Sequence, residues 1–191
     1  MIRSFLAIEL PENLKGSIAS VINELRKIPS NIKWVSSENT HLTLKFFGSI
    51  PDERVEKISQ TLLKVAPAYP RFKLSLKGLG AFPNLFRPRV IWAGLGGEIE
   101  ILQGFYHDLE LALIPLGIPK EERPFHPHLT LGRNKLNQIN EPLYTLLSGW
   151  SKEETASFEV QELIFFRSDL KPAGPVYTRL GVFPLEQNNV L

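Results

Sequence analysis

The sequence contains no cysteine and only one methionine among its 191 residues. The lack of cysteine excludes disulfides, thiolate metal sites and a cysteine nucleophile. No apolar run approaches the ~18 residues of a membrane-spanning helix. The opening Met1 to Leu10 is too short, and turns acidic too soon, for a signal peptide. We therefore expect a cytoplasmic protein without a membrane segment.

A strong excess of charge of either sign is also missing. The formal net charge is +2, and 43% of the residues are hydrophobic while 22% are charged. This composition is typical of a globular chain with one domain or two small fused lobes. A mildly basic balance permits a polyanionic ligand but does not require one.

Histidine is scarce, yet two of the four histidines each begin a copy of the same four-residue motif. The sequence His-Leu-Thr-Leu occurs at residues 41–44 and again at residues 128–131. Because alternate side chains of a strand share a face, the histidine and threonine of each copy should face one way and the leucines the other. In the first strand this alternation also predicts that Phe46 faces the core and that Gly48 ends the strand.

Apolar periodicity predicts the remaining elements. Strands are expected at 2–10, 33–35, 40–47, 72–77, 90–93, 157–166 and 176–183 and around the second motif. Helices are expected at 12–25, 52–65, 98–113 and 141–147, with turn-rich loops at 82–89 and 167–175. Each motif strand thus follows one helix and precedes another. We expect a single domain, residues 1–191, with two intertwined lobes that each contribute one motif to a shared cleft.

Two histidines that face one cleft suit acid–base chemistry. Near neutral pH one imidazole can accept a proton while the other donates one. The hydroxyls of Thr43 and Thr130 can donate hydrogen bonds to phosphate oxygens, and Arg133 can add a permanently charged clamp. Carboxylates do not cluster near either motif, so no magnesium or calcium site is predicted and no cofactor is expected.

Other roles also fit the histidines. A single His-x-Thr strand is most often structural, and His126, His128 and His41 together could instead bind a metal ion. His107 lies off the apolar stripe of its helix and is expected at the surface. His126 is expected to be a structural or loop residue.

Aromatic side chains near the motifs are candidates for RNA contact. Trp34 precedes the first motif, and Phe47 shares the predicted face of its histidine. Phe82 begins a loop that also contains two arginines, a mixture typical of single-stranded RNA binding. An ordinary hairpin whose phenylalanines point into the core fits that loop somewhat better.

The paired motifs and their surroundings resemble the two-histidine (2H) phosphoesterases. Within that superfamily the chain resembles the RNA 2′,3′-cyclic phosphodiesterase branch, also called the 2′-5′ RNA ligase family. The similar segments are residues 3–11, 34–35, 41–48, 90–94, 125–133, 165–168 and 174–177. They span nearly the whole chain, and the paired motifs are specific where either motif alone would not be.

The resemblance implies a bilobed α+β fold with two pseudo-symmetric antiparallel sheets, flanked by helices around a central cleft. It implies metal-independent hydrolysis of RNA 2′,3′-cyclic phosphate ends to 2′-phosphomonoesters, with His128 as the base and His41 as the acid. The residues that would hold the phosphate are Thr43, Thr130 and Arg133.

The implied partner is an RNA with a 2′,3′-cyclic phosphate end, for which tRNA fragments and small cyclic nucleotides are candidates. The protein itself would be a monomer. Two alternatives stay open at this stage. One is reversible 2′-5′ RNA ligation, and the other is a non-catalytic RNA- or nucleotide-binding module.

Overall fold

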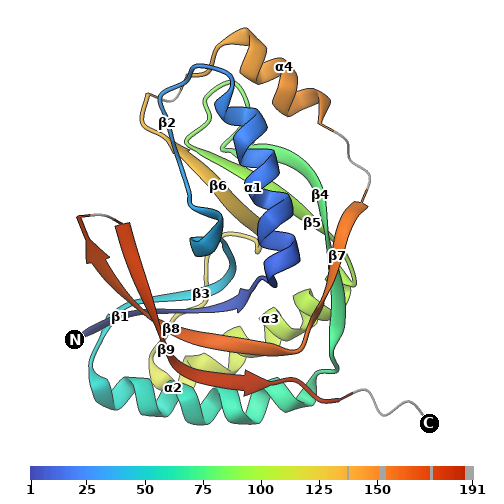
Figure 1. Ribbon diagram of the computed structural model, residues 1–191. Helices are drawn as coiled ribbons and strands as arrows, with labels where there is room; N and C mark the ends of the chain where they lie inside the picture. The colour runs from blue at the N-terminus through green and yellow to red at the C-terminus, as the bar shows by residue number, and fades with distance from the viewer. Residues whose placement is uncertain (137, 151–153, 173, 188–191) are drawn as a thin grey trace.

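The computed structural model describes residues 1–136, 138–150, 154–172 and 174–187, whose strands form one curled antiparallel sheet (Figure 1). The strands are β1 (Ile2–Glu9), β2 (Ile32–Trp34), β3 (His41–Ile50), β4 (Phe72–Phe82), β5 (Val90–Gly97), β6 (His128–Asn134), β7 (Glu154–Val160), β8 (Glu162–Lys171) and β9 (Gly174–Pro184). Their order is β7-β4-β5-β6-β3-β1-β8-β9, and β2 pairs with β6. The predicted α+β class with antiparallel pairing is therefore confirmed.

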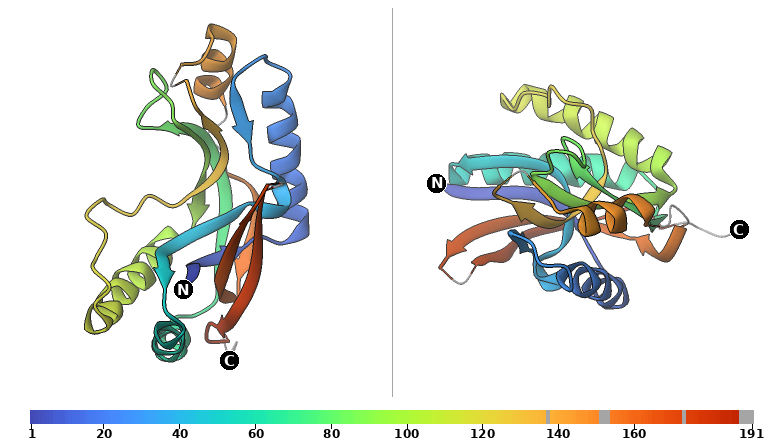
Figure 2. Two further views of the ribbon diagram at one scale, coloured as in Figure 1. Left: turned by 90° about the vertical axis from the view of Figure 1, so that its left-hand side faces the viewer. Right: turned by 90° about the horizontal axis from the view of Figure 1, so that it is seen from above.

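Helices flank this sheet. They are α1 (Glu12–Arg26), α2 (Asp52–Val65), α3 (Ile99–Leu113) and α4 (Glu141–Gly149), with 3₁₀ turns at Ser37–Asn39, Ala66–Ala68 and Ile114–Leu116. Helices α1 and α4 lie beside the half of the sheet that holds β4, β5 and β6, whereas α2 and α3 lie together at the other end of the molecule (Figures 1 and 2). Apolar residues of all four helices share one buried core with the sheet. In the described ranges, no helix is long and apolar enough to cross a membrane.

The two motif strands join the halves of the sheet. Strand β3 pairs with β6 through Leu42, which lies opposite Leu129. Both leucines are fully buried in the common core. The two sheets expected from the sequence are thus halves of one continuous sheet, and the motif strands meet at its middle.

The predicted alternation along β3 was wrong after Leu44. The register with β1 passes from Thr43 to Lys45 and omits Leu44, as at a β-bulge, which places an extra residue in one strand. Lys45 is therefore buried, and Phe46, predicted to face the core, is 45% exposed. Gly48 does not end the strand: its φ of +70° fits glycine, and β3 continues to Ile50.

Several other predicted boundaries were too narrow. Strand β4 continues to Phe82, and β5 continues through Gly94 to Gly97. The single strand expected at 157–166 is the C-terminal part of β7 and the first part of β8, separated at Gln161. Most of the loop expected at 167–175 belongs to the β8–β9 hairpin, although its residue 173 lies outside the described residues. Cross-strand pairing extends these strands beyond the apolar runs that identified them.

Candidate active site

The two motifs line the same cavity, which has a volume of about 750 Å³. His41 and Thr43 enter it from β3, and His128, Thr130 and Arg133 enter it from β6. Most of the other lining residues come from β2, α1 and the segment after β2, and from β1 and the β8–β9 hairpin. The fold therefore brings together the five residues that the sequence singled out for phosphate chemistry.

Arg133 reaches the cavity because β6 contains the same irregularity as β3. Strict alternation from His128 would turn residue 133 toward the leucine face. The register with β5 instead passes from Thr130 to Gly132 and omits Leu131, so Leu131 and Gly132 are both buried and Arg133 returns to the cavity side. Each motif thus has a bulge at its second leucine.

A backbone carbonyl anchors each motif histidine in the same way. The Nδ1 atom of His41 lies 2.9 Å from the carbonyl oxygen of Asn39, and that of His128 lies 2.7 Å from the carbonyl oxygen of His126. A carbonyl oxygen can only accept, so each Nδ1 must carry the hydrogen. In the neutral ring Nε2 is then the unprotonated nitrogen, the atom that can exchange a proton with a ligand.

Aromatic rings fix the orientation of both imidazoles. Phe5 stacks on His41 with centroids 4.7 Å apart, and Tyr177 meets the same ring edge-on at 5.3 Å. Phe82 meets His128 edge-on at 4.9 Å. These contacts give each ring a rigid support, which a site for proton transfer needs.

Of the three aromatic residues predicted to contact RNA, one lines the cavity and two do not. Trp34 lines the cavity. Phe47 does not, because the bulge turns it toward the core, where it meets Phe165 edge-on at 5.3 Å. Phe82 is also outside the cavity lining, since its ring supports His128. Phe46 occupies the place in the cavity that alternation had assigned to Phe47.

The remaining histidines lie outside the cavity lining. The ring of His126 packs 5.2 Å from Trp92 and 5.4 Å from Phe82, and its carbonyl orients His128. His107 is exposed on α3, as predicted. Within the described residues no three histidine, aspartate or glutamate side chains gather as a metal site would require.

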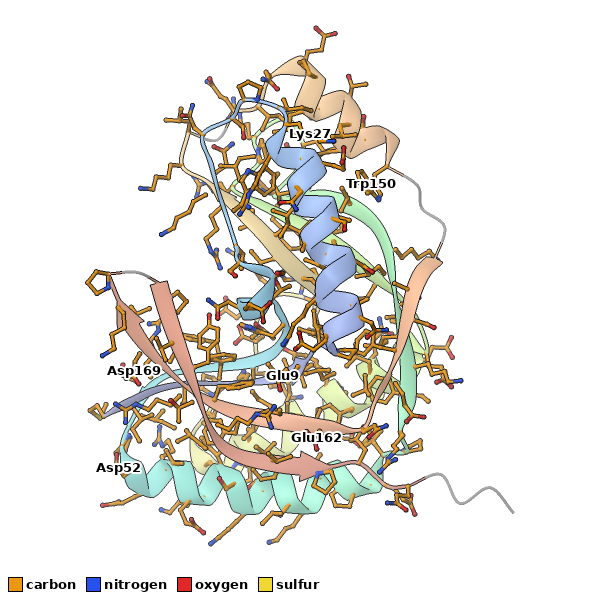
Figure 3. The ribbon with its side chains drawn as sticks, in the orientation of Figure 1. Glu9, Lys27, Asp52, Trp150, Glu162 and Asp169 are labelled. Atoms are coloured by element: carbon orange, nitrogen blue, oxygen red, sulfur yellow. The ribbon has the colours of Figure 1, made fainter. Side chains whose placement is uncertain are left out.

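Burial lowers the pKa of both motif histidines. It lowers the pKa of His41 from 6.5 to about 4, although the nearby Glu9 carboxylate acts in the opposite direction. Burial also lowers the pKa of His128, and there the positive charge of Arg133 lowers it further. Glu9, which is labelled in Figure 3, stands at the C-terminal end of β1, opposite His41 in the strand register, and is paired with Arg179. The charges near the two rings thus differ in sign.

This pKa shift predicts a loss of stability in acid. Between pH 6.5 and about 4 the unfolded chain binds a proton at His41 that the folded chain does not. The contribution of neutral His41 is fully present above pH 6.5 and disappears as the pH falls toward 4, for a total of about 3 kcal/mol. Urea denaturation at a series of pH values should show this slope.

The matched variants are His41→Asn, which cannot titrate, and His107→Asn on the exposed surface of α3. Between pH 6.5 and about 4, the free energy of unfolding of His41→Asn should fall by about 3 kcal/mol less than that of wild type. The carboxylates are common to both proteins, so their contributions cancel in the comparison. His107→Asn should follow wild type. Parallel pH curves for wild type and His41→Asn would contradict the prediction.

Four basic residues line the cavity, and no aspartate or glutamate does so in the part of the chain that the structure describes. The basic residues are Arg3, Arg26, Lys33 and Arg133. A concave wall with charge of one sign attracts anions and raises their local concentration. Of these residues only Arg133 was predicted, because the other three lie on elements that become neighbours of the motifs only in the folded chain.

The absence of a side chain at Gly132 leaves room for the ring of Trp34, which lines the cavity. A Cβ atom at this position would lie 2.5 Å from Cγ2 of Ile32 and 2.8 Å from Cε3 of Trp34. We expect Gly132→Ala to displace the Trp34 ring and to lower the free energy of unfolding by about 1–3 kcal/mol, the usual effect of overpacking. Thermal unfolding, with tryptophan fluorescence as a second signal, would measure both effects.

Gly16→Ala in α1 is the matched control. Nothing lies within 4 Å of a Cβ at that position, and alanine stabilises a helix interior by roughly 0.5–1 kcal/mol relative to glycine. The two glycine-to-alanine changes should therefore have opposite signs. If Gly132→Ala were as stable as wild type, β2 would be able to move away from the added methyl group without a loss of folding free energy, and the prediction would be wrong.

Known proteins share both the sequence and the fold. The family model described as LigT like Phosphoesterase matches residues 8–92 and 99–177. An RNA 2′,3′-cyclic phosphodiesterase of Methanothermobacter thermautotrophicus is 34% identical over 184 residues, which are 96% of this chain and 99% of that protein. A second protein with the same name, from Archaeoglobus fulgidus, is 33% identical over 181 residues, or 95% of this chain and 99% of its own.

Solved structures agree with this result. E. coli LigT complexed with 3′-AMP superimposes with a TM-score of 0.76 and 26% identity, over 96% of this chain and 98% of that one. The protein TT0787 of Thermus thermophilus superimposes with a TM-score of 0.74 and 31% identity, over 98% of this chain and all of that one. The match extends over both motifs and nearly the whole length, so this chain belongs to the LigT-like phosphoesterase family.

Proposed function

We propose that this protein hydrolyses the 2′,3′-cyclic phosphate end of RNA to a 2′-phosphomonoester. The observation that carries the proposal is the pair of histidines in one basic cavity, each with Nδ1 bound to a carbonyl and Nε2 left to exchange a proton. The names of the curated relatives support the same substrate.

The proposed reaction needs one proton acceptor and one proton donor. One imidazole takes a proton from water, and the resulting hydroxide attacks phosphorus. The bond from phosphorus to O3′ then breaks, and the second imidazole gives its proton to O3′. The hydroxyls of Thr43 and Thr130 and the guanidinium of Arg133 stabilise the charge that grows on the non-bridging phosphate oxygens.

The neighbouring charges favour one assignment of the two roles. Glu9 favours the protonated form of His41, whereas Arg133 favours the neutral form of His128. We therefore assign His41 as the acid and His128 as the base. Since burial lowers the pKa of His41, the negative charge of the bound cyclic phosphate must raise it before the ring can act as the acid.

We also propose that the whole chain works as one domain and that a monomer suffices. Each half of the sheet supplies one motif, so a single chain contributes both histidines, both threonines and the basic wall. No residue of a second copy is needed to complete the proposed chemistry. Sedimentation at concentrations used for the assay would test the monomer.

The test of the function uses an end-labelled oligoribonucleotide that terminates in a 2′,3′-cyclic phosphate. Turnover should add one water to the substrate, and NMR of the product should place the phosphate on O2′. A 3′-phosphate product would contradict the proposed cleavage of the bond to O3′. Binding without turnover of any cyclic end would instead leave a nucleotide-binding module.

A further inference from the structure

Two cations of the cavity wall lie directly opposite each other on neighbouring strands. Lys33 of β2 pairs in register with Arg133 of β6. Directly opposite side chains share one face of a sheet, and like charges in this arrangement destabilise the sheet. Both side chains are exposed, and both line the cavity. An anion bound beside them would offset this repulsion.

Helix α1 adds two polar side chains to the same cavity. Residues at a spacing of three and four, which share one face of a helix, line it from α1. They are Ala19, Ile22, Asn23 and Arg26. The amide of Asn23 and the guanidinium of Arg26 can both donate hydrogen bonds to an anion. Where the structure describes the chain, neither Arg26 nor Lys33 has a carboxylate partner, and Glu24 of α1 pairs with Lys27 instead.

These donors lie at a distance from the residues proposed to hold the cyclic phosphate. Strands β3 and β2 follow each other along one edge of β6, where Leu42 pairs with Leu129 and Lys33 pairs with Arg133. Four residues of β6 separate the two pairs, and one of them is taken up by the bulge. At a rise of ~3.3 Å per residue, the other three correspond to roughly 10 Å along the sheet. Such a separation suits two neighbouring phosphates of one RNA chain better than two oxygens of one phosphate.

We propose that Lys33, Arg26 and Asn23 form a second phosphate subsite, which binds the phosphodiester on the 5′ side of the terminal nucleotide. This inference rests on the proposed function and deepens it, because it makes the enzyme selective for the end of a chain over a single nucleotide. A nucleoside 2′,3′-cyclic phosphate has one phosphate, whereas a longer RNA end has another on O5′ of its terminal ribose. Phosphate contacts position a nucleic acid without reading its bases, so the selectivity is independent of sequence.

The experiment compares two dinucleotide substrates that differ only in the charge of the internal linkage. Both are ApA with a 2′,3′-cyclic phosphate end. One has the natural phosphodiester linkage, and the other has a neutral methylphosphonate. We expect the kcat/KM of wild type to be about tenfold higher for the charged dinucleotide, the usual size of one hydrogen bond to a charged group. In Lys33→Gln/Arg26→Gln the ratio of the two kcat/KM values should fall to near one, and each single variant should lose part of it.

Arg3→Gln is the matched control for the total charge of the cavity. Arg3 also lines the cavity, but it lies on β1, where it pairs with Ser49 near the far end of β3. A loss of general attraction for anions would lower the ratio equally in Arg3→Gln and Lys33→Gln. A local subsite instead predicts that Arg3→Gln keeps the ratio near tenfold, and unfolding curves establish that all variants are folded. Equal ratios in Arg3→Gln and Lys33→Gln would overturn the subsite while the proposed hydrolysis stands.

Absence of turnover by wild type would overturn the proposed hydrolysis, and calorimetry would then decide the subsite independently. The probes are adenosine 2′-monophosphate and adenosine 2′,5′-bisphosphate, which has a second phosphate on O5′. Wild type should bind the bisphosphate about tenfold more tightly, and Lys33→Gln/Arg26→Gln should bind the two nucleotides equally. Equal binding of both nucleotides by wild type, or a preference that the double variant keeps, would overturn the subsite as well.

Discussion

Replacement of either His41 or His128 by alanine is expected to lower kcat/KM for an RNA 2′,3′-cyclic phosphate by about 10³-fold. A positioned acid or base contributes roughly 10²–10⁴-fold, and each variant removes one of the two proton carriers. The effect should appear in kcat rather than in KM, because the threonines, Arg133 and the basic wall still bind the phosphate. Steady-state kinetics with a purified oligonucleotide would measure it.

The two losses should not add. Once one proton carrier is absent the other has little left to contribute, so the double variant should be nearly as active as the weaker single variant. His107→Ala, on the exposed face of α3, is the control and should match wild type. A single variant at either motif that retained a tenth of wild-type activity would contradict a mechanism with two histidines.

The shape of the variants matters because His41 packs against Phe5. Alanine leaves a void beside that ring, whose centroid is 4.7 Å from the imidazole. His41→Asn fills more of the space and cannot carry the proton from Nε2. The same loss of kcat in both variants would trace the effect to the proton rather than to packing.

The sequence predicted those parts of the fold and the site that depend on the periodicity of strands and helices. Alternation placed His41 and Thr43 on one face and Leu42 on the other, and that arrangement is observed over the motif itself. Helical periodicity located the four α-helices to within a few residues. These elements were predictable because each buries an apolar stripe that the local sequence alone displays.

The bulges were not predictable in the same way. The register between two strands decides where an extra residue is accommodated, and that register depends on the partner strand. The exchange of Lys45 and Phe46 between core and cavity therefore contradicted the pattern of β3 taken alone. Phe47 was lost from the predicted contacts for the same reason, whereas Arg3 was missed because β1 becomes a neighbour of the motif strands only in the folded chain.

The largest stability effect is expected at the residue that this bulge turns inward. The Lys45 side chain is 2% exposed, and its Nζ lies 2.8 Å from Oε1 of Glu110 on α3. It also lies 2.9 Å from the carbonyl oxygen of Pro119, to which it donates, and 3.3 Å from Oε1 of Glu121. A lysine in a core requires such partners, because burial of an unpaired charge is very costly.

Lys45→Met should lower the free energy of unfolding by about 3–5 kcal/mol, because it leaves the buried Glu110 carboxylate without its partner. For a chain of this length, that loss corresponds to a fall in Tm of roughly 10 °C. Lys27→Met is the matched control on the surface. Lys27 is labelled in Figure 3 at the C-terminal end of α1. Its Nζ lies 2.6 Å from Oε1 of Glu24, and both side chains are more than half exposed. Lys27→Met should cost less than about 1 kcal/mol.

The double variant Lys45→Met/Glu110→Gln separates loss of charge balance from loss of packing. Glutamine keeps an oxygen to accept from the backbone N–H of Glu121, which lies 2.6 Å from the Glu110 carboxylate, but leaves no unpaired charge in the core. We expect it to recover most of the lost stability, since removal of both charges is far less costly than removal of one. A double variant no more stable than Lys45→Met would mean that Lys45 acts through packing. The ion pair ties β3, which carries the first motif, to α3 and to the segment that leads into the second. The charge balance of Lys45 therefore stabilises the connection between the two halves of the proposed site.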